Sequence, residues 1–270
     1  MFRTRLISGI VLVVCALALI ITGGNVLLVS TLLLSIIGLY ELMKALKMEK
    51  TAIAYISYLM TLFYYLNLKF RWISNPVVYT IIFLIVILAA YVLGFPKYSA
   101  LNVMGGFFGF FYVSAMLSFI YLTRDIPVKG KYYVWLIFLC AWGSDTFAYC
   151  AGRLFGKHKM APVLSPKKTV EGALGGIIGA ALLTMGYSYY FKMQLNFQPR
   201  ELILIGVIGA VGALVSMIGD LAASAIKREY DIKDYGKLIP GHGGVLDRFD
   251  SIIITAPIVY FLALTLVHRI

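Results

Sequence analysis

Long runs of apolar residues dominate the sequence, and short polar segments separate them. A helix that crosses the hydrocarbon core of a bilayer needs about 20 such residues, with a range of about 17–25. The runs are continuous rather than alternating, and only helices or closed barrels satisfy backbone hydrogen bonds in lipid. The pattern predicts nine transmembrane helices, at Leu6–Thr22, Val26–Met43, Ala52–Leu68, Val77–Leu93, Val103–Leu122, Tyr132–Ala151, Gly172–Tyr190, Leu202–Ile226 and Ile252–Leu266.

Composition agrees with a membrane protein. Of the 270 residues, 61% are hydrophobic and only 13% are charged, about half the charged fraction of a soluble domain. These values exclude a soluble globular chain and a disordered one. They also exclude a nucleic-acid-binding interpretation of the net charge of +12, because a basic groove requires a soluble fold. We therefore expect an all-α, polytopic integral membrane helical bundle.

Lysine and arginine residues predict the orientation of this bundle. With nine spans, the N-terminus shares a side with the loops after spans two, four, six and eight, and this side carries 16 of the 24 basic residues. The positive-inside rule then places the N-terminus in the cytoplasm and the C-terminus outside. The first apolar run resembles a signal peptide, but it lacks a small-residue cleavage site, and we interpret it as a retained span.

Acidic residues concentrate in the second half of the chain. Nine of the 12 Asp and Glu residues lie between Asp145 and Asp250. We expect residues 1–130 to form a scaffold of transmembrane helices. Residues 131–270 would form a catalytic part with cytoplasmic loops 152–171 and 227–250.

Asp220 lies inside the apolar run of span eight. A carboxylate at that depth is energetically expensive and indicates a functional site by default. At helical spacing, Asp220, Ser224, Lys227 and Asp231 fall on one face of the helix. The alternative is a purely structural ion pair between Asp220 and a lysine or arginine.

Asp145 interrupts span six in the same way. The loop that follows contains Lys167 and Lys168 beside small and hydroxyl residues, and these lysines could hold phosphates. The alternative is that both lysines only mark the cytoplasmic side of the membrane.

A glycine-rich loop precedes span nine. Four of the nine residues from Gly236 to Gly244 are glycines, which let backbone N–H groups approach an anion closely. Asp247 and Asp250 follow the loop, and carboxylates together with phosphate are typical Mg²⁺ ligands. The alternative is a loop whose glycines serve only as turns.

These features share one predicted membrane face. Carboxylates with cations at headgroup level favour metal-assisted phosphate chemistry. A transporter or cation channel that uses Asp145 and Asp220 is the alternative, and it leaves the glycine-rich loop and the Lys227–Arg228 pair unexplained.

The residues resemble those of a known family. Ser224, Lys227–Arg228, Lys233–Asp234, Ile239–Gly244 and Asp247–Asp250 look like the complete signature of the phosphatidate cytidylyltransferases, also called CDP-diacylglycerol synthases. A second stretch, from Asp145 to Gly172, is also similar to the family. Residues 1–130 match only in being apolar helices.

The resemblance implies an integral enzyme of the bacterial cytoplasmic membrane that converts CTP and phosphatidate to CDP-diacylglycerol and pyrophosphate, with Mg²⁺ and room for a second cation. Its expected partners are CTP, the lipid and the bilayer, without nucleic acid, and a homodimer is compatible with the glycine-rich spans. A related enzyme that acts on a different lipid would carry the same motifs. We expect catalytic roles for Asp220, Lys227, Arg228, Asp247 and Asp250, metal ligation by Asp220, Asp247 and Asp145, and substrate binding by Ser224, Lys167, Lys168, Lys233, His242, Gly243, Gly244 and Arg248.

Overall fold

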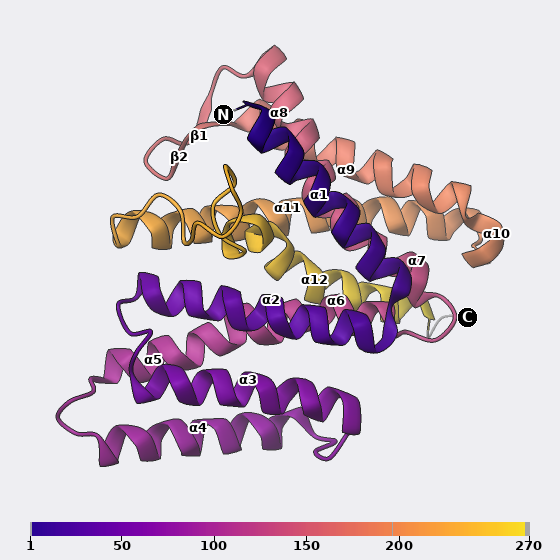
Figure 1. Ribbon diagram of the computed structural model, residues 1–270. Helices are drawn as coiled ribbons and strands as arrows, with labels where there is room; N and C mark the ends of the chain where they lie inside the picture. The colour runs from indigo at the N-terminus through magenta and orange to yellow at the C-terminus, as the bar shows by residue number, and fades with distance from the viewer. Residues whose placement is uncertain (1, 196, 268–270) are drawn as a thin grey trace. The chain divides into compact units, whose positions relative to one another are not determined.

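The computed structural model describes residues 2–195 and 197–267, and helices dominate it (Figure 1). Every predicted span is helical, and most helix ends lie within four residues of the predicted ends. The largest difference is at α12, which starts six residues earlier than expected. The elements are α1 (Phe2–Thr22), α2 (Gly24–Ala45), α3 (Ala52–Phe70), α4 (Pro76–Leu93), α5 (Ala100–Gly109), η1 (Phe110–Ala115), α6 (Met116–Arg124), α7 (Gly130–Phe138), η2 (Leu139–Gly143), α8 (Ser144–Phe155), β1 (Lys159–Ala161), β2 (Ser165–Thr169), α9 (Val170–Tyr190), α10 (Lys192–Leu195), α11 (Pro199–Glu229) and α12 (Leu246–Val267).

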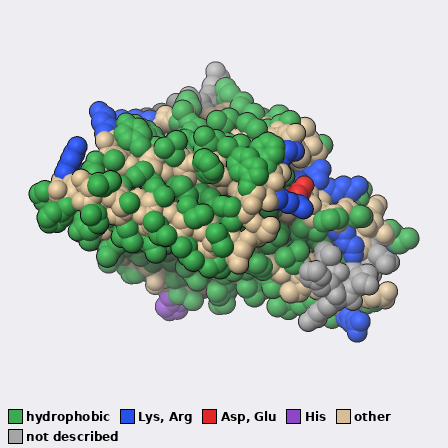
Figure 2. Space-filling view, turned by 90° about the horizontal axis from the view of Figure 1, so that it is seen from below, with side chains coloured by type: hydrophobic (Ala, Val, Ile, Leu, Met, Phe, Trp, Pro, Cys, Tyr) green, Lys and Arg blue, Asp and Glu red, His purple; other side chains and the backbone are tan. Residues whose placement is uncertain are grey.

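The described part of the chain contains seven helices that are long and apolar enough to cross a membrane. They are α2, α4, the continuous helix 100–124, the continuous helix 130–155, α9, α11 and α12. The expected count of nine is not confirmed: α3 carries several tyrosines and Lys69, and of α1 the residues whose side chains the structure describes, from Ile7 to Thr22, form a shorter apolar helix. Hydrophobic side chains dominate the face shown in Figure 2, and Lys and Arg side chains gather at its edges. The chain is thus an all-α, multi-pass membrane protein.

The chain divides into two compact units. The first unit comprises residues 1–118 and 230–248, and the second comprises residues 119–229 and 249–270. In the first unit, α2, α3 and α4 lie side by side in chain order (Figure 1). In the second, α9 packs between α8 and α11. The division at residue 130 into scaffold and catalytic parts stays a prediction.

Glycines allow the helices of the second unit to pack closely. A Cβ atom added at Gly175 of α9 would lie 2.2 Å from the Cβ atom of Ala151 in α8. A Cβ atom at Gly209 of α11 would lie 2.1 Å from Oγ1 of Thr184 in α9. These glycine-rich spans therefore pack closely against helices of the same chain.

The loop between α8 and α9 forms a small hairpin. Strands β1 and β2 pair antiparallel, with Lys159 opposite Thr169 and Ala161 opposite Ser165. Thr169 then caps α9, because its hydroxyl oxygen accepts a hydrogen bond from the Gly172 N–H at 3.1 Å. The hairpin thus places Lys167 and Lys168 on strand β2, directly before the start of α9.

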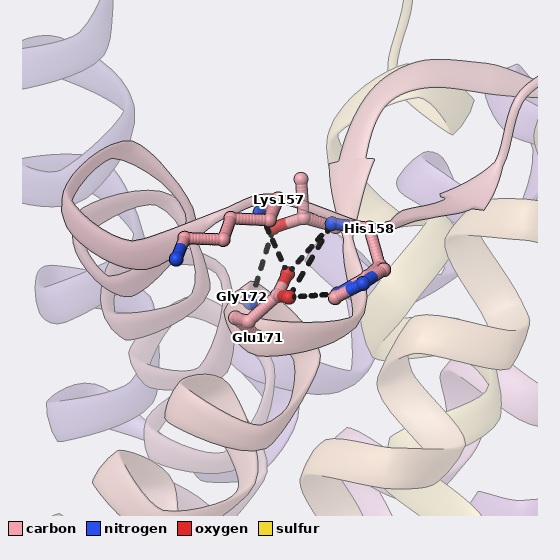
Figure 3. A network of polar contacts seen from close by, with 5 residues as sticks. Lys157, His158, Glu171 and Gly172 are labelled. Carbon is pink, nitrogen blue, oxygen red and sulfur yellow. Dashed lines mark hydrogen bonds and ion pairs between the residues drawn. The ribbon is translucent and has the colours of Figure 1, made fainter.

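Glu171, in the first turn of α9, holds the base of this hairpin (Figure 3). Its carboxylate accepts hydrogen bonds from the backbone N–H groups of Lys157, at 3.1 Å, and His158, at 3.2 Å. It also pairs with Nδ1 of the His158 ring at 2.6 Å. One acidic side chain therefore joins both ends of the loop.

The glycine packing gives a matched pair of substitutions on α9. We expect Gly175→Ala to lower the free energy of unfolding by about 1–3 kcal/mol, because the added methyl overpacks the contact with Ala151. Gly186→Ala is the control, since nothing lies within 4 Å of the position that its Cβ atom would occupy. Thermal unfolding in detergent measures both. Equal stability of the two variants would contradict the close α8–α9 contact.

The Glu171 clamp predicts local rather than global loosening. We expect Glu171→Ala to raise the rate of trypsin cleavage after Lys157, Lys159 and Lys167 about fivefold, because three hydrogen bonds to the loop are lost while the helices stay packed. Glu201→Ala, which removes an acceptor for the Gln198 N–H at the start of α11, serves as control. Cleavage at the wild-type rate would show that the clamp does not order the hairpin.

Candidate active site

Three acidic residues and two lysines come together in the second unit. Asp250, in the first turns of α12, interacts electrostatically with Asp220 of α11, Asp145 of α8 and Lys227. Lys168 of β2 forms an ion pair with Asp220, and both side chains are about one-quarter exposed, at 25% and 26%. The predicted Asp145, Asp220 and Asp250 therefore lie within electrostatic range of one another, although they are separated by up to about a hundred positions in sequence.

Three of the four residues predicted to share a polar face, Asp220, Ser224 and Lys227, lie on helix α11. Ser224 Oγ donates a hydrogen bond to Asp220 Oδ1 at 3.4 Å, and Lys227 follows on the same helix. Asp231 does not belong to this face, contrary to the expectation from helical spacing. The helix ends at Glu229, and Asp231 has a left-handed backbone with φ of 52°. Arg228 is exposed near the end of α11.

A π-helical stretch positions Asp145. η2 lies directly before α8, and it packs against both α9 and α11. Such wider turns are rare and frequently accompany functional sites. The sequence showed only a continuous apolar run here, so this feature was not predicted.

A cavity of about 300 Å³ opens beside these groups in the second unit. Asp145, Arg153, Lys167 and Lys168 supply its charged wall. The rest of the lining is largely apolar and includes Met160 and Met217. The cavity therefore suits a molecule with an anionic end and an apolar body.

Asp247, in the first unit, organises the backbone around it. It is only 6% exposed, and its Oδ2 accepts hydrogen bonds from the N–H groups of Tyr235, at 2.8 Å, and Gly244, at 3.0 Å. Metal ligation by Asp247 stays a prediction. A metal bound there would have to use Oδ1 or share Oδ2 with these two donors.

The glycine-rich loop contains a tight turn. The Ile239 N–H donates to the Gly243 carbonyl at 2.8 Å, and the His242 N–H donates to the Ile239 carbonyl at 2.9 Å. Gly241 and Gly243 have φ values of 78° and 87°, which only glycine adopts readily. These two glycines therefore form turns, and a role of Gly243 in substrate binding stays a prediction.

The ring of His242 faces helix α1. Ser8 Oγ donates to the Pro240 carbonyl at 3.0 Å and lies 2.8 Å from His242 Nδ1. This contact holds the imidazole ring of His242 beside α1, so its predicted role in substrate binding depends on the other ring nitrogen, Nε2.

A second cavity, of about 640 Å³, lies on the glycine-rich loop within the first unit. Lys233, Lys237, His242 and Arg248 line it, together with Gly243. Asp234, which the resemblance also singled out, lines it as well. The first unit thus gathers the predicted Lys233, His242, Gly243 and Arg248 around one concave surface.

Whether the second unit could bind a metal ion depends on its carboxylates. Their oxygen atoms are the ligand type that Mg²⁺ prefers. Among the described residues, no group of three or more His, Cys, Asp or Glu side chains is close enough to hold an ion. In this arrangement the ammonium group of Lys168, rather than a further acidic residue, accompanies Asp220.

Glu41 was not predicted as a site residue. It lies near the end of α2, is 5% exposed, and accepts hydrogen bonds from the N–H groups of Val245 and Leu246. Its only signal in the sequence was a single carboxylate at the end of an apolar run, which is also typical of an interfacial residue.

Comparison with known proteins agrees with this chemistry. The model of the cytidylyltransferase family matches residues 3–266. A phosphatidate cytidylyltransferase of Staphylococcus haemolyticus is 31% identical over 96% of this chain and 98% of its own. Those of Staphylococcus saprophyticus and Staphylococcus aureus are 32% and 30% identical over the same shares.

A match over nearly the whole chain, together with the acidic and basic groups described above, identifies the enzyme class. The chain belongs to the cytidylyltransferase family, with the phosphatidate cytidylyltransferases among its relatives, and it is a nucleotidyltransferase of the membrane.

Proposed function

We propose that the protein is a CTP:phosphatidate cytidylyltransferase that makes CDP-diacylglycerol and pyrophosphate. The observation that carries this proposal is the convergence of Asp145, Asp220 and Asp250 with Lys168 and Lys227. Carboxylates and cations in this mixture suit the transfer of a nucleotidyl group between two phosphates. The names of the staphylococcal relatives support the choice of CTP and phosphatidate.

The reaction requires little proton chemistry. An oxygen atom of the phosphatidate phosphate forms a bond to the α-phosphorus of CTP, and the bond from that phosphorus to the bridging β-phosphate oxygen breaks. The nucleophile is already an anion, so no strong base is needed. The obstacle is the repulsion between two polyanions, which positioning and charge neutralisation overcome.

The two cavities suggest how the substrates divide. The cavity of the second unit combines Arg153, Lys167 and Lys168 with apolar side chains, as the phosphate and glycerol of a lipid require. The larger cavity of the first unit is lined by Lys233, Lys237 and Arg248, which suit a triphosphate. We assign phosphatidate to the cavity of the second unit and CTP to the cavity of the first unit.

Mg²⁺ belongs to the proposal as cofactor. Asp220 and Asp145 would supply carboxylate oxygens to it, and because no three acidic side chains of the described residues form a ready cluster, substrate phosphates would supply further ligands. Ligation by Asp247 and a second cation remain part of the hypothesis. When bound, the ion neutralises phosphate charge. Lys168, which pairs with Asp220, would also supply a cation for a substrate phosphate.

The cytoplasmic face is the proposed side of the reaction. CTP is a cytoplasmic nucleotide, whereas phosphatidate keeps its acyl chains in the bilayer. The basic loops 152–171 and 227–250, which carry most of the proposed site, favour that side.

A transfer assay tests the activity. Purified protein should convert CTP and phosphatidate to CDP-diacylglycerol, and EDTA should abolish turnover. We expect Asp220→Asn to lower kcat by at least about 100-fold, because it removes charge at the reacting phosphates. Asp125→Asn, an exposed carboxylate before α7, is the control. Turnover of another phospholipid acceptor but not phosphatidate would move the proposal to a related lipid, and near-normal activity of Asp220→Asn would remove that residue from the site.

Cysteine labelling tests the side of the membrane. In a variant without Cys15, Cys140 and Cys150, we expect a cysteine at Val163, which is 84% exposed in the hairpin loop, to react with an impermeant maleimide only after the cells are opened. A cysteine at Val128, 81% exposed between α6 and α7, should react in intact cells. The reverse pattern would place the proposed site outside.

A further inference from the structure

Glu41 is a buried acidic residue in a part of the chain that the sequence marked only as scaffold. It lies in the last turns of α2 and is 5% exposed. A carboxylate with so little access to water needs hydrogen bonds or a counter-charge to be stable. Its partners therefore show what it does.

Both oxygens of Glu41 bind the backbone at the start of α12. Oε1 accepts the Val245 N–H at 3.1 Å, and Oε2 accepts the Leu246 N–H at 2.8 Å. Leu246 is the first residue of α12, so its N–H has no partner within the helix. A carboxylate at this position also interacts favourably with the helix dipole. Glu41 thus caps α12 from a different helix.

The Glu41 carboxylate also leaves no room for a side chain at two positions of the loop, Gly236 and Gly244. A Cβ atom added at Gly236 would lie 2.2 Å from Glu41 Oε1, and one added at Gly244 would lie 2.3 Å from it. Both distances are far below any real contact of a Cβ atom. Gly236 and Gly244 are the two ends of the loop, and Glu41 fills the space between them. These two glycines therefore make room for a protein carboxylate, whereas the sequence suggested that they make room for a substrate phosphate.

Asp247 completes this arrangement from the other side. Its Oδ2 accepts the N–H groups of Gly244 and Tyr235. The N–H groups of Gly244, Val245 and Leu246, which are consecutive, are therefore all bound by Asp247 or Glu41. Consecutive N–H groups of this kind usually form an anion site. Here the anions belong to the protein, so the hydrogen bonds that hold this end of the loop come from the chain itself.

We propose that Glu41 is a positioning residue, which fixes the glycine-rich loop so that Lys233, Lys237 and Arg248 face one cavity in the arrangement that a nucleoside triphosphate requires. Glu41 does not touch the nucleotide in this proposal. It acts through residues 236–246, whose ends it holds. The identity of the nucleotide rests on the proposed function, but the ordering of the loop does not.

Two measurements on Glu41→Gln test the proposal. The amide keeps one acceptor oxygen and places an NH₂ group against a backbone N–H, so one hydrogen bond is lost and a donor is left unpaired. We expect the KM for CTP to rise about tenfold, with kcat and the KM for phosphatidate changed by less than about twofold. Hydrogen–deuterium exchange of residues 236–246 should become faster without nucleotide. Glu49→Gln, a half-buried carboxylate in the loop after α2, is the matched control.

A rescue experiment separates positioning from folding. Gly244→Ala alone should impair CTP binding strongly, because the methyl group collides with Glu41. Shortening the acid in Glu41→Asp/Gly244→Ala should withdraw the carboxylate and restore at least about one-third of the lost CTP affinity, as compensation between contacting residues predicts. This comparison remains informative if Glu41→Gln fails to fold.

The outcomes are distinct. Unchanged KM for CTP and unchanged exchange in Glu41→Gln, or no rescue in the double variant, would overturn the role of Glu41. A wild-type protein that orders residues 236–246 through Glu41 but shows no turnover of CTP would overturn the proposed function and leave the loop-ordering role supported.

Discussion

Every acidic side chain within the apolar helices must be neutralised, and this requirement determines much of the architecture around the proposed site. A buried carboxylate without a partner costs several kcal/mol, which is comparable with the whole stability of a domain. Asp220 meets the requirement with Lys168, an ion pair that ties the β1–β2 hairpin to α11. Because Glu171, at the start of α9, also binds the backbone N–H groups of Lys157 and His158 just before the hairpin, the two ends of the hairpin loop are held together.

Two solutions to the same problem occur in the two units. In the second unit, a lysine accompanies an acidic residue, as Lys168 does Asp220. In the first unit, backbone N–H groups bind Glu41 and Asp247, and such donors belong to the fold itself. The first arrangement leaves charges available for chemistry, whereas the second yields a rigid loop. Each arrangement fits a general requirement of electrostatic stabilisation, namely that charges are effective only when they are already in place.

The helices could be predicted from hydropathy because a span needs only length and apolar composition, and every predicted span is helical. The number that could cross a membrane was less predictable, since α3 lies near the limit of polarity with its tyrosines and Lys69. Asp220 and Asp145 were recognisable because each interrupts an apolar run. Asp231 was misplaced, because helical spacing alone does not show that α11 ends at Glu229. Glu41 could not be found, because its partners are more than 200 positions away.

The glycines show why composition alone does not identify an anion site. Gly175 and Gly209 permit close helix packing, Gly241 and Gly243 permit left-handed backbone, and Gly236 and Gly244 leave space for Glu41. All six look alike in the sequence. What distinguishes them is the constraint that excludes a Cβ atom: a neighbouring helix, a left-handed backbone conformation, or a carboxylate. Where the constraint is an acidic side chain of the protein, as at Gly236 and Gly244, the glycine indicates a loop held by the protein itself, and the phosphate-binding charge must come from the cations that the loop carries.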